Sequence, residues 1–105
     1  MNESYIEIDL TEICEIVEIP EQTLVELVEQ GIVTPSGEQP ADWTFDTTMV
    51  SVAKRAARLQ RELELDWAAI AVVVELIEQR NQLQEENELL RQRLQRFLQD
   101  QVIDI

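Results

Sequence analysis

The spacing of apolar side chains changes along this chain, from short alternating stretches near its start to long helical periodicity in its second half. Residues 5–9 alternate apolar and polar side chains, which predicts a short strand. Residues 43–45 alternate in the same way, and we expect them to form a small wing strand that pairs with residues 5–8. The chain therefore carries a minimal β element within a mainly helical sequence.

Two short amphipathic helices are predicted between these stretches. Asp9 and Glu12 have the spacing of a capping box, and Gly31 stands where a helix ends in a left-handed cap. Pro20 suits the first turn of the second helix, which we expect over residues 21–30. The inward positions are Ile13, Cys14, Ile16 and Val17 in the first helix and Leu24, Leu27 and Val28 in the second. Two short helices joined by a tight turn predict a helix-turn-helix.

Two longer helices follow, each with an aspartate at its predicted N-cap. Asp46 precedes a helix over residues 47–64, and Asp66 precedes a helix that begins at Trp67. The inward positions of the first of these helices are Val50, Ala53, Ala57 and Leu63. No glycine or proline interrupts the pattern after Trp67, so we expect a helix of about 30 residues that frays from Gln99.

Apolar residues recur every seven positions in this last helix, which predicts a coiled-coil seam. Arg80 and Asn87 place polar side chains at core positions of the seam. A monomer would expose an apolar stripe to water, so we expect the seam to pair with a second copy and form a homodimer. The predicted dimerisation residues are Leu76, Leu83, Asn87, Leu90, Leu94 and Phe97.

These patterns predict a mainly α fold, with a winged helix-turn-helix head, a minimal β wing and a long C-terminal coiled-coil helix. We place the acidic head at residues 1–66 and the long dimerising helix at residues 67–105. With 105 residues and 45% apolar content, the chain is long enough for one compact core.

Charge changes this picture, because a helix-turn-helix is usually built to bind DNA. The formal net charge is −14, and every Lys and Arg of the chain lies at or after Lys54. A protein that binds DNA neutralises phosphates with Lys and Arg, and the stretch before Lys54 has none. This stretch therefore has the wrong sign for nucleic acid or an anionic membrane, and the right sign for a basic protein surface.

The residue inventory argues against an enzyme. The chain has no His, so it lacks an imidazole base and the commonest metal ligand, and its 2 glycines form no phosphate-binding loop. We expect no catalytic residue, no cofactor and no metal. Cys14 is the single cysteine, and we expect a buried small hydrophobe there, with a redox-sensing role as the lesser alternative.

The beginning of the chain has no apolar signal segment, and its longest apolar run, residues 67–74, is too short to span a bilayer. We therefore expect a cytoplasmic protein.

The order of elements resembles the head of the MerR-type regulators. The corresponding stretches are Tyr5-Ile6, residues 19–24 (IPEQTL), residues 31–35 (GIVTP) and residues 43–46 (WTFD). MerR-type regulators carry Arg and Tyr on the second helix and Arg in the wing. Here those places hold residues such as Val25, Glu26 and Thr44. The Arg and Tyr side chains with which that family contacts DNA are therefore absent.

A narrower resemblance, over about residues 5–98, is to the CbpM family of chaperone modulator proteins. It rests on residues 43–46, residues 55–71 (RAARLQRELELDWAAIA) and residues 84–97 (QEENELLRQRLQRF). The resemblance implies a bacterial, dimeric protein that binds the J-domain of the DnaJ-like co-chaperone CbpA. It further implies inhibition of the stimulation of DnaK by CbpA and of DNA binding by CbpA, with nucleoid association through that partner.

The acidic head suits such a partner, because the J-domain face that docks on DnaK is rich in Lys and Arg. From charge and exposure, the candidate partner-binding residues are Glu21, Glu26, Glu29, Asp42, Trp43, Glu62, Glu64 and Asp66. An exposed Trp43 would supply an aromatic anchor, and packing of this ring into the wing is the alternative. Phe45 is expected in the core.

The orientation of the coiled coil stays open. Asn87 and a pairing of Glu86 with Arg91 of the second copy favour parallel helices. MerR-like dimers use antiparallel helices, which we prefer by analogy.

Two other functions are consistent with the sequence. A MerR-type transcription regulator would bind DNA through the basic cluster Lys54, Arg55, Arg58 and Arg61. The other alternative is a structural oligomerisation module with no chaperone role.

Overall fold

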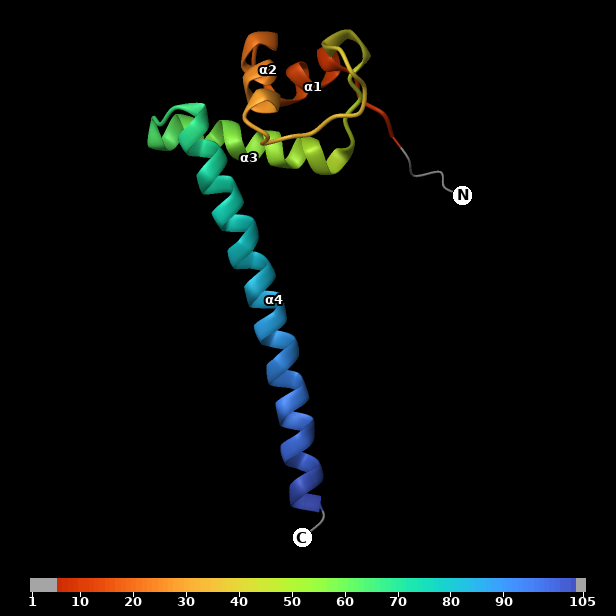
Figure 1. Cartoon of the computed structure of the whole chain (residues 1–105), viewed down its shortest axis with the longest axis vertical. Coiled ribbons are helices and arrows are strands. Elements are labelled where there is room, and N and C mark those ends of the chain that lie inside the picture. Colours follow the sequence, from red (N-terminus) through yellow and green to blue (C-terminus); the bar gives the residue numbers. More distant parts are fainter. Residues whose placement is uncertain (1–5, 104–105) are drawn as a thin grey trace. The chain divides into compact units, whose positions relative to one another are not determined.

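The structure is a computed structural model that describes residues 6–103, with side chains described for residues 6–100. Its helices are α1 (Leu10–Val17), α2 (Glu21–Glu29), the 3-10 helix η1 (Pro40–Asp42), α3 (Thr47–Leu63) and α4 (Trp67–Ile103) (Figure 1). The predicted mainly α fold is confirmed. The chain forms two compact units, the first extending through Val74 and the second beginning at Glu75.

Three helices begin at the aspartates that the sequence marks as caps. The Asp9 carboxylate accepts the backbone N–H of Glu12 at 2.8 Å, and the Glu12 carboxylate accepts the backbone N–H of Asp9 at 2.9 Å. Asp46 and Asp66 each accept the backbone N–H three residues on, at 2.9 and 2.8 Å. These hydrogen bonds satisfy backbone donors that a helix start otherwise leaves free.

The turns around α2 are held by left-handed residues. Gly31 has φ 76, as the sequence predicts for the end of α2, and the next backbone N–H, of Ile32, donates to the Leu27 carbonyl at 2.9 Å. Glu18 ends α1 in the same conformation, with φ 64 and its N–H on the Cys14 carbonyl at 2.8 Å. The turn at Glu18 joins α1 to α2 as a helix-turn-helix, and Gly31 ends the second of these helices.

The predicted wing does not form strands among the described residues. Ile8 and Phe45 make a single antiparallel bridge with N–H to carbonyl distances of 2.9 and 2.8 Å, and Ser36 and Thr44 make another with distances of 3.1 and 3.0 Å. Tyr5, the first residue of the predicted strand, lies outside the described residues.

The caps explain why the pairing of Ile8 with Phe45 is so short. Asp9 follows Ile8 and caps α1, while Asp46 follows Phe45 and caps α3. Each extended segment therefore turns into a helix directly after the residue that takes part in the bridge between Ile8 and Phe45. The alternation in the sequence predicts the extended backbone correctly but not the length of the pairing.

One core fills the first unit. Phe45 is 1% exposed, and Ile13, Leu24, Leu27 and Ile70 are also fully buried. The remaining core residues are Ile8, Cys14, Val17, Val33, Ala53, Ala56, Ala57 and Val74. The prediction that Phe45 is a core residue is confirmed.

Two positions predicted to face inward do not. Ile16 on α1 is 45% exposed, and Leu63, the last residue of α3, is 48% exposed. Helix α1 has eight residues and buries a narrow stripe of Ile13, Cys14 and Val17, which leaves Ile16 at its edge.

Gly37 determines how the loop before α3 folds. Its φ is 106, and a Cβ atom built on it would lie 2.5 Å from the backbone oxygen of Asp42. Gly31 has φ 76, but a Cβ atom there would meet nothing within 4 Å. Both glycines have a left-handed backbone, but only Gly37 would clash when given a Cβ atom. Comparing alanine variants at the two positions therefore distinguishes the cost of the backbone conformation from the cost of the clash.

Gly37→Ala is expected to destabilise the protein by about 2 kcal/mol more than Gly31→Ala, because the alanine methyl group collides with the Asp42 carbonyl in addition to straining the backbone. Urea denaturation of both variants measures the difference. An equal loss of unfolding free energy in the two variants would show that the loop accommodates the alanine methyl group at Gly37 without an energetic penalty.

The second unit is one continuous helical segment. Helix α4 continues through Ile103, past Gln99 where we expect fraying. From Glu75 to Asp100 its side chains are exposed, apart from the half-buried Ile77. Within residues 6–103, no helix combines the length and apolar character needed to cross a membrane.

Candidate partner-binding surfaces

The first candidate surface is the outer face of α2. Glu21, Glu26 and Glu29 are exposed, while Leu24 and Leu27 of the same helix are fully buried. The helical period places Glu26 and Glu29 away from the two leucines. Packing of α2 against α1 thus forces these carboxylates outward, where no basic side chain of the helix offsets them.

Asp42 and Trp43 form the second candidate surface, in the loop before α3. Asp42 is exposed at the end of η1, and Trp43 is half-buried. The Trp43 ring meets the Phe45 ring edge to face, with centroids 6.2 Å apart and an interplanar angle of 87°. One part of the indole is thus packed on the core and another part is accessible.

The third candidate surface is the elbow between α3 and α4. Glu62, Glu64 and Asp66 are all exposed there. Glu64 ends α3 with a left-handed φ of 54, while the Asp66 carboxylate accepts the backbone N–H of Ala69. Asp66 therefore has a structural role in addition to its negative charge.

The structure does not gather these residues into one patch. Asp42 and Trp43 precede the start of α3, and the elbow follows its end (Figure 1). A helix of 17 residues is roughly 25 Å long, so the two surfaces are far apart. We therefore treat α2, the loop and the elbow as separate candidates.

The basic cluster of α3 lies beside a surface hollow that the sequence does not reveal. Lys54, Arg55, Arg58 and Arg61 are all exposed. The hollow is lined by Ile16, Val17, Glu18, Lys54, Ala57, Arg58 and Arg61. It arises because α1 packs on α3, and spacing along the chain does not predict that contact.

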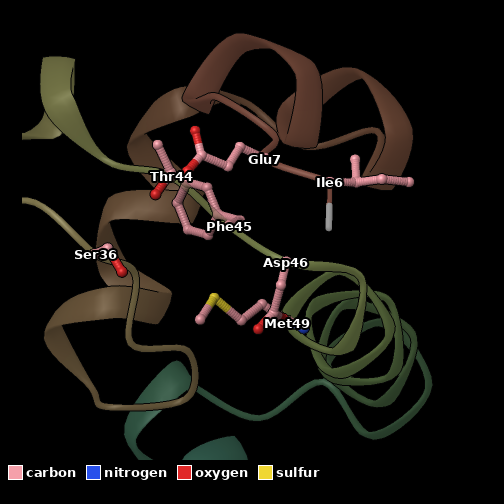
Figure 2. Close-up of a pocket in the computed structure, with 7 residues that line it drawn as sticks. All are labelled: Ile6, Glu7, Ser36, Thr44, Phe45, Asp46 and Met49. Carbon is pink, nitrogen blue, oxygen red and sulfur yellow. Dashed lines mark hydrogen bonds between the residues drawn. The ribbon is translucent and has the colours of Figure 1, made fainter. Parts of the chain in front are cut away.

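A second, smaller hollow lies beside the residues predicted as a wing (Figure 2). It is lined by Ile6, Glu7, Ser36, Thr44, Phe45, Asp46 and Met49. The Asp46 carboxylate is already engaged as the cap of α3, and we assign no ligand to this hollow.

Cys14 is buried, as predicted, with 8% of its surface exposed. Burial raises the pKa of the Cys14 thiol, and the Glu21 carboxylate raises it further. The thiolate is the reactive form, so a raised pKa argues against redox sensing by this cysteine. Among the residues that the structure describes, no group of His, Cys, Asp and Glu is arranged to hold a metal ion.

Comparison with known proteins gives these surfaces a family context. The family described as "MerR HTH family regulatory protein" matches residues 8–92. A chaperone modulatory protein CbpM of Pseudomonas putida is 43% identical over 94 residues, which are 90% of this chain and 93% of that protein. The CbpM of Pseudomonas entomophila is 42% identical over the same shares. The CbpM of Salmonella paratyphi B is 46% identical over 89 residues, which are 85% of this chain and 88% of that protein. The chain therefore belongs to the CbpM family of chaperone modulatory proteins, within the MerR-type helix-turn-helix group.

Proposed function

We propose that this protein is a non-enzymatic, dimeric modulator that binds the J-domain of a CbpA-type co-chaperone. Binding blocks the stimulation of DnaK by that co-chaperone and reduces its binding to DNA. Membership of the CbpM family supports the role of a chaperone modulator. The J-domain as the partner is our proposal.

One observation carries the choice of partner. In a MerR-type head the exposed face of α2 would meet DNA, and here it carries Glu21, Glu26 and Glu29 and no basic residue. A surface of that sign repels phosphates and attracts a Lys- and Arg-rich protein face, mainly by accelerating and selecting the encounter. The J-domain face that docks on DnaK has this basic character.

The dimer rests on the seam of α4. The predicted dimerisation residues Leu76, Leu83, Asn87, Leu90, Leu94 and Phe97 are all exposed in the single chain. Leu83 and Leu90 leave 64% and 60% of their surfaces to water. An exposed, mainly apolar stripe of this kind is typical of a helix that has a partner.

The purified protein is expected to capture a CbpA-type J-domain and to lower the J-domain-stimulated ATPase rate of DnaK. The reason is that an occupied basic face of the J-domain is closed to DnaK. A J-domain with its basic docking residues replaced by alanine is the matched control. Failure to capture the J-domain at low salt would reject the proposal.

Transcription regulation is the second candidate, favoured by the exposed cluster Lys54, Arg55, Arg58 and Arg61 on α3. This cluster contains half of the eight basic residues of the chain. Tight, sequence-selective DNA binding in a gel-shift assay at low salt would favour this function over the first.

A further inference from the structure

The hollow between α1 and α3 is not used by the proposed function, yet it offers an apolar contact on the surface of the first unit. Its floor is apolar, because Val17 of α1 is 6% exposed and Ala57 of α3 is 3% exposed. Ile16 of α1 also lines the hollow and leaves 45% of its surface to water. The hollow has a volume of about 380 Å³, which suits a few side chains of a bound segment rather than a whole domain.

Three cationic side chains of α3 line the same hollow. Lys54, Arg58 and Arg61 follow one another at spacings of four and three residues, so they lie along one face of the helix. All three are exposed, and within residues 6–100 none of the side-chain hydrogen bonds involves them. An arginine presents a planar fork of N–H donors that matches the two oxygens of a carboxylate. These side chains are therefore available to bind an external anion beside an apolar contact.

The surroundings of the hollow indicate which kind of anion it accepts. Helix α1 carries exposed Glu15 and Glu18 and no basic residue, and Glu18 itself lines the hollow. Duplex DNA carries a negative charge about every 1.7 Å along its axis, so a duplex that reached the cations here would also bring phosphates to these carboxylates. A polypeptide can instead place its carboxylates on α3 alone and an aliphatic side chain between them. The hollow therefore favours a protein segment over nucleic acid.

We propose that the hollow between α1 and α3 binds a short acidic segment of a partner protein. One aliphatic side chain of the segment lies on Ile16 and Val17, while its carboxylates pair with Arg58 and Arg61. Glu18 repels carboxylates from the α1 side, so the acidic edge of the segment faces α3. The contact has the opposite sign to the acidic surface of α2 and does not depend on the J-domain.

The net charge of −14 does not prevent this contact. At physiological ionic strength the screening length is about 8 Å, so charges farther away than this contribute little to a contact at the surface. The cations that line the hollow then outweigh the more distant acidic residues. Very low salt lengthens the range of the repulsion, and binding is therefore best measured at about 0.15 M salt.

A fluorescein-labelled peptide with one leucine between two pairs of glutamates tests the charged contact. Fluorescence anisotropy with the full chain measures the affinity, and circular dichroism checks that each variant keeps its helicity. R58E is expected to weaken binding tenfold or more, because it replaces a paired cation by a repelling carboxylate. R55E is the matched control, since Arg55 is exposed on α3 but does not line the hollow. It changes the net charge equally and is expected to weaken binding less than about threefold.

A second pair of variants tests the apolar contact. I16A is expected to weaken binding of the leucine peptide about fivefold, because it removes apolar surface that the leucine covers. I6A is the control, since Ile6 is 57% exposed and does not line this hollow, and it should leave the affinity unchanged. A peptide with serine in place of leucine probes the same contact without altering the protein and should bind about fivefold more weakly.

Four results would overturn the proposal. The first is an equal loss of affinity in R58E and R55E, which would show a diffuse attraction rather than a site. The second is equal affinity for the leucine and serine peptides, which would show that the apolar floor is not used. The third is a short DNA duplex that binds more tightly than the peptide at the same salt and is unaffected by I16A. The fourth is no peptide binding at about millimolar concentration.

Discussion

Replacing both Glu26 and Glu29 with lysine is expected to weaken binding of a CbpA-type J-domain tenfold or more. Both carboxylates are exposed on α2, and packing of Leu24 and Leu27 points them away from the core. The double replacement removes two attractive charges and adds two repulsive ones, so both association rate and selectivity fall. Titration calorimetry at two salt concentrations measures the effect, which is expected to shrink as salt rises.

A control variant separates local charge from net charge. Glu78→Lys with Glu85→Lys changes the net charge by the same amount, but on the exposed outer face of α4. We expect this control to alter affinity by much less than the α2 variant. Unchanged affinity of the α2 variant at moderate salt would count against α2 and leave the loop or the elbow as the docking surface.

The helix boundaries were predictable because short-range chemistry sets them. Asp9, Asp46 and Asp66 each accept a backbone N–H three residues ahead, and Gly31 supplies the left-handed residue that ends α2. Such signals need no knowledge of the tertiary fold.

The positions that depend on tertiary contacts were not predictable in this way. Ile16 has the periodicity of a core residue, yet it lies at the edge of the α1–α3 contact and lines the basic hollow. The extent of the wing depends on two caps that end both segments at once, which alternation alone does not reveal. The hollow beside Arg58 and Arg61 has no sequence signal, because it exists only where α1 meets α3.

Exposure of the acidic candidate residues was predictable from charge, but their division into separate surfaces was not. Asp42 and Glu64 both belong to the acidic set, yet they lie at opposite ends of α3. A single J-domain need not cover all of them. Variants that affect α2, the loop and the elbow one at a time therefore carry more information than a reversal of the whole acidic head.

Phe45 and Trp43 are neighbouring aromatic residues with different expected roles, and alanine at each should separate stability from binding. Phe45 is 1% exposed in the core, so Phe45→Ala should reduce the free energy of unfolding by about 3–5 kcal/mol. It also removes the ring on which Trp43 rests, at a centroid distance of 6.2 Å. Urea denaturation with tryptophan fluorescence measures this loss.

Trp43→Ala is expected to leave the fold largely intact, because the indole is only half-buried, and to weaken J-domain binding about tenfold or more if the ring is an interface anchor. Trp43→Phe is the matched variant, since it keeps an aromatic edge against Phe45 and should recover part of the affinity. Titration calorimetry of the two folded variants distinguishes the roles. A Trp43→Ala protein that loses stability as Phe45→Ala does would show that Trp43 belongs to the core. A stable Trp43→Ala protein that binds the J-domain as tightly as the wild type would show that the indole is not an interface anchor.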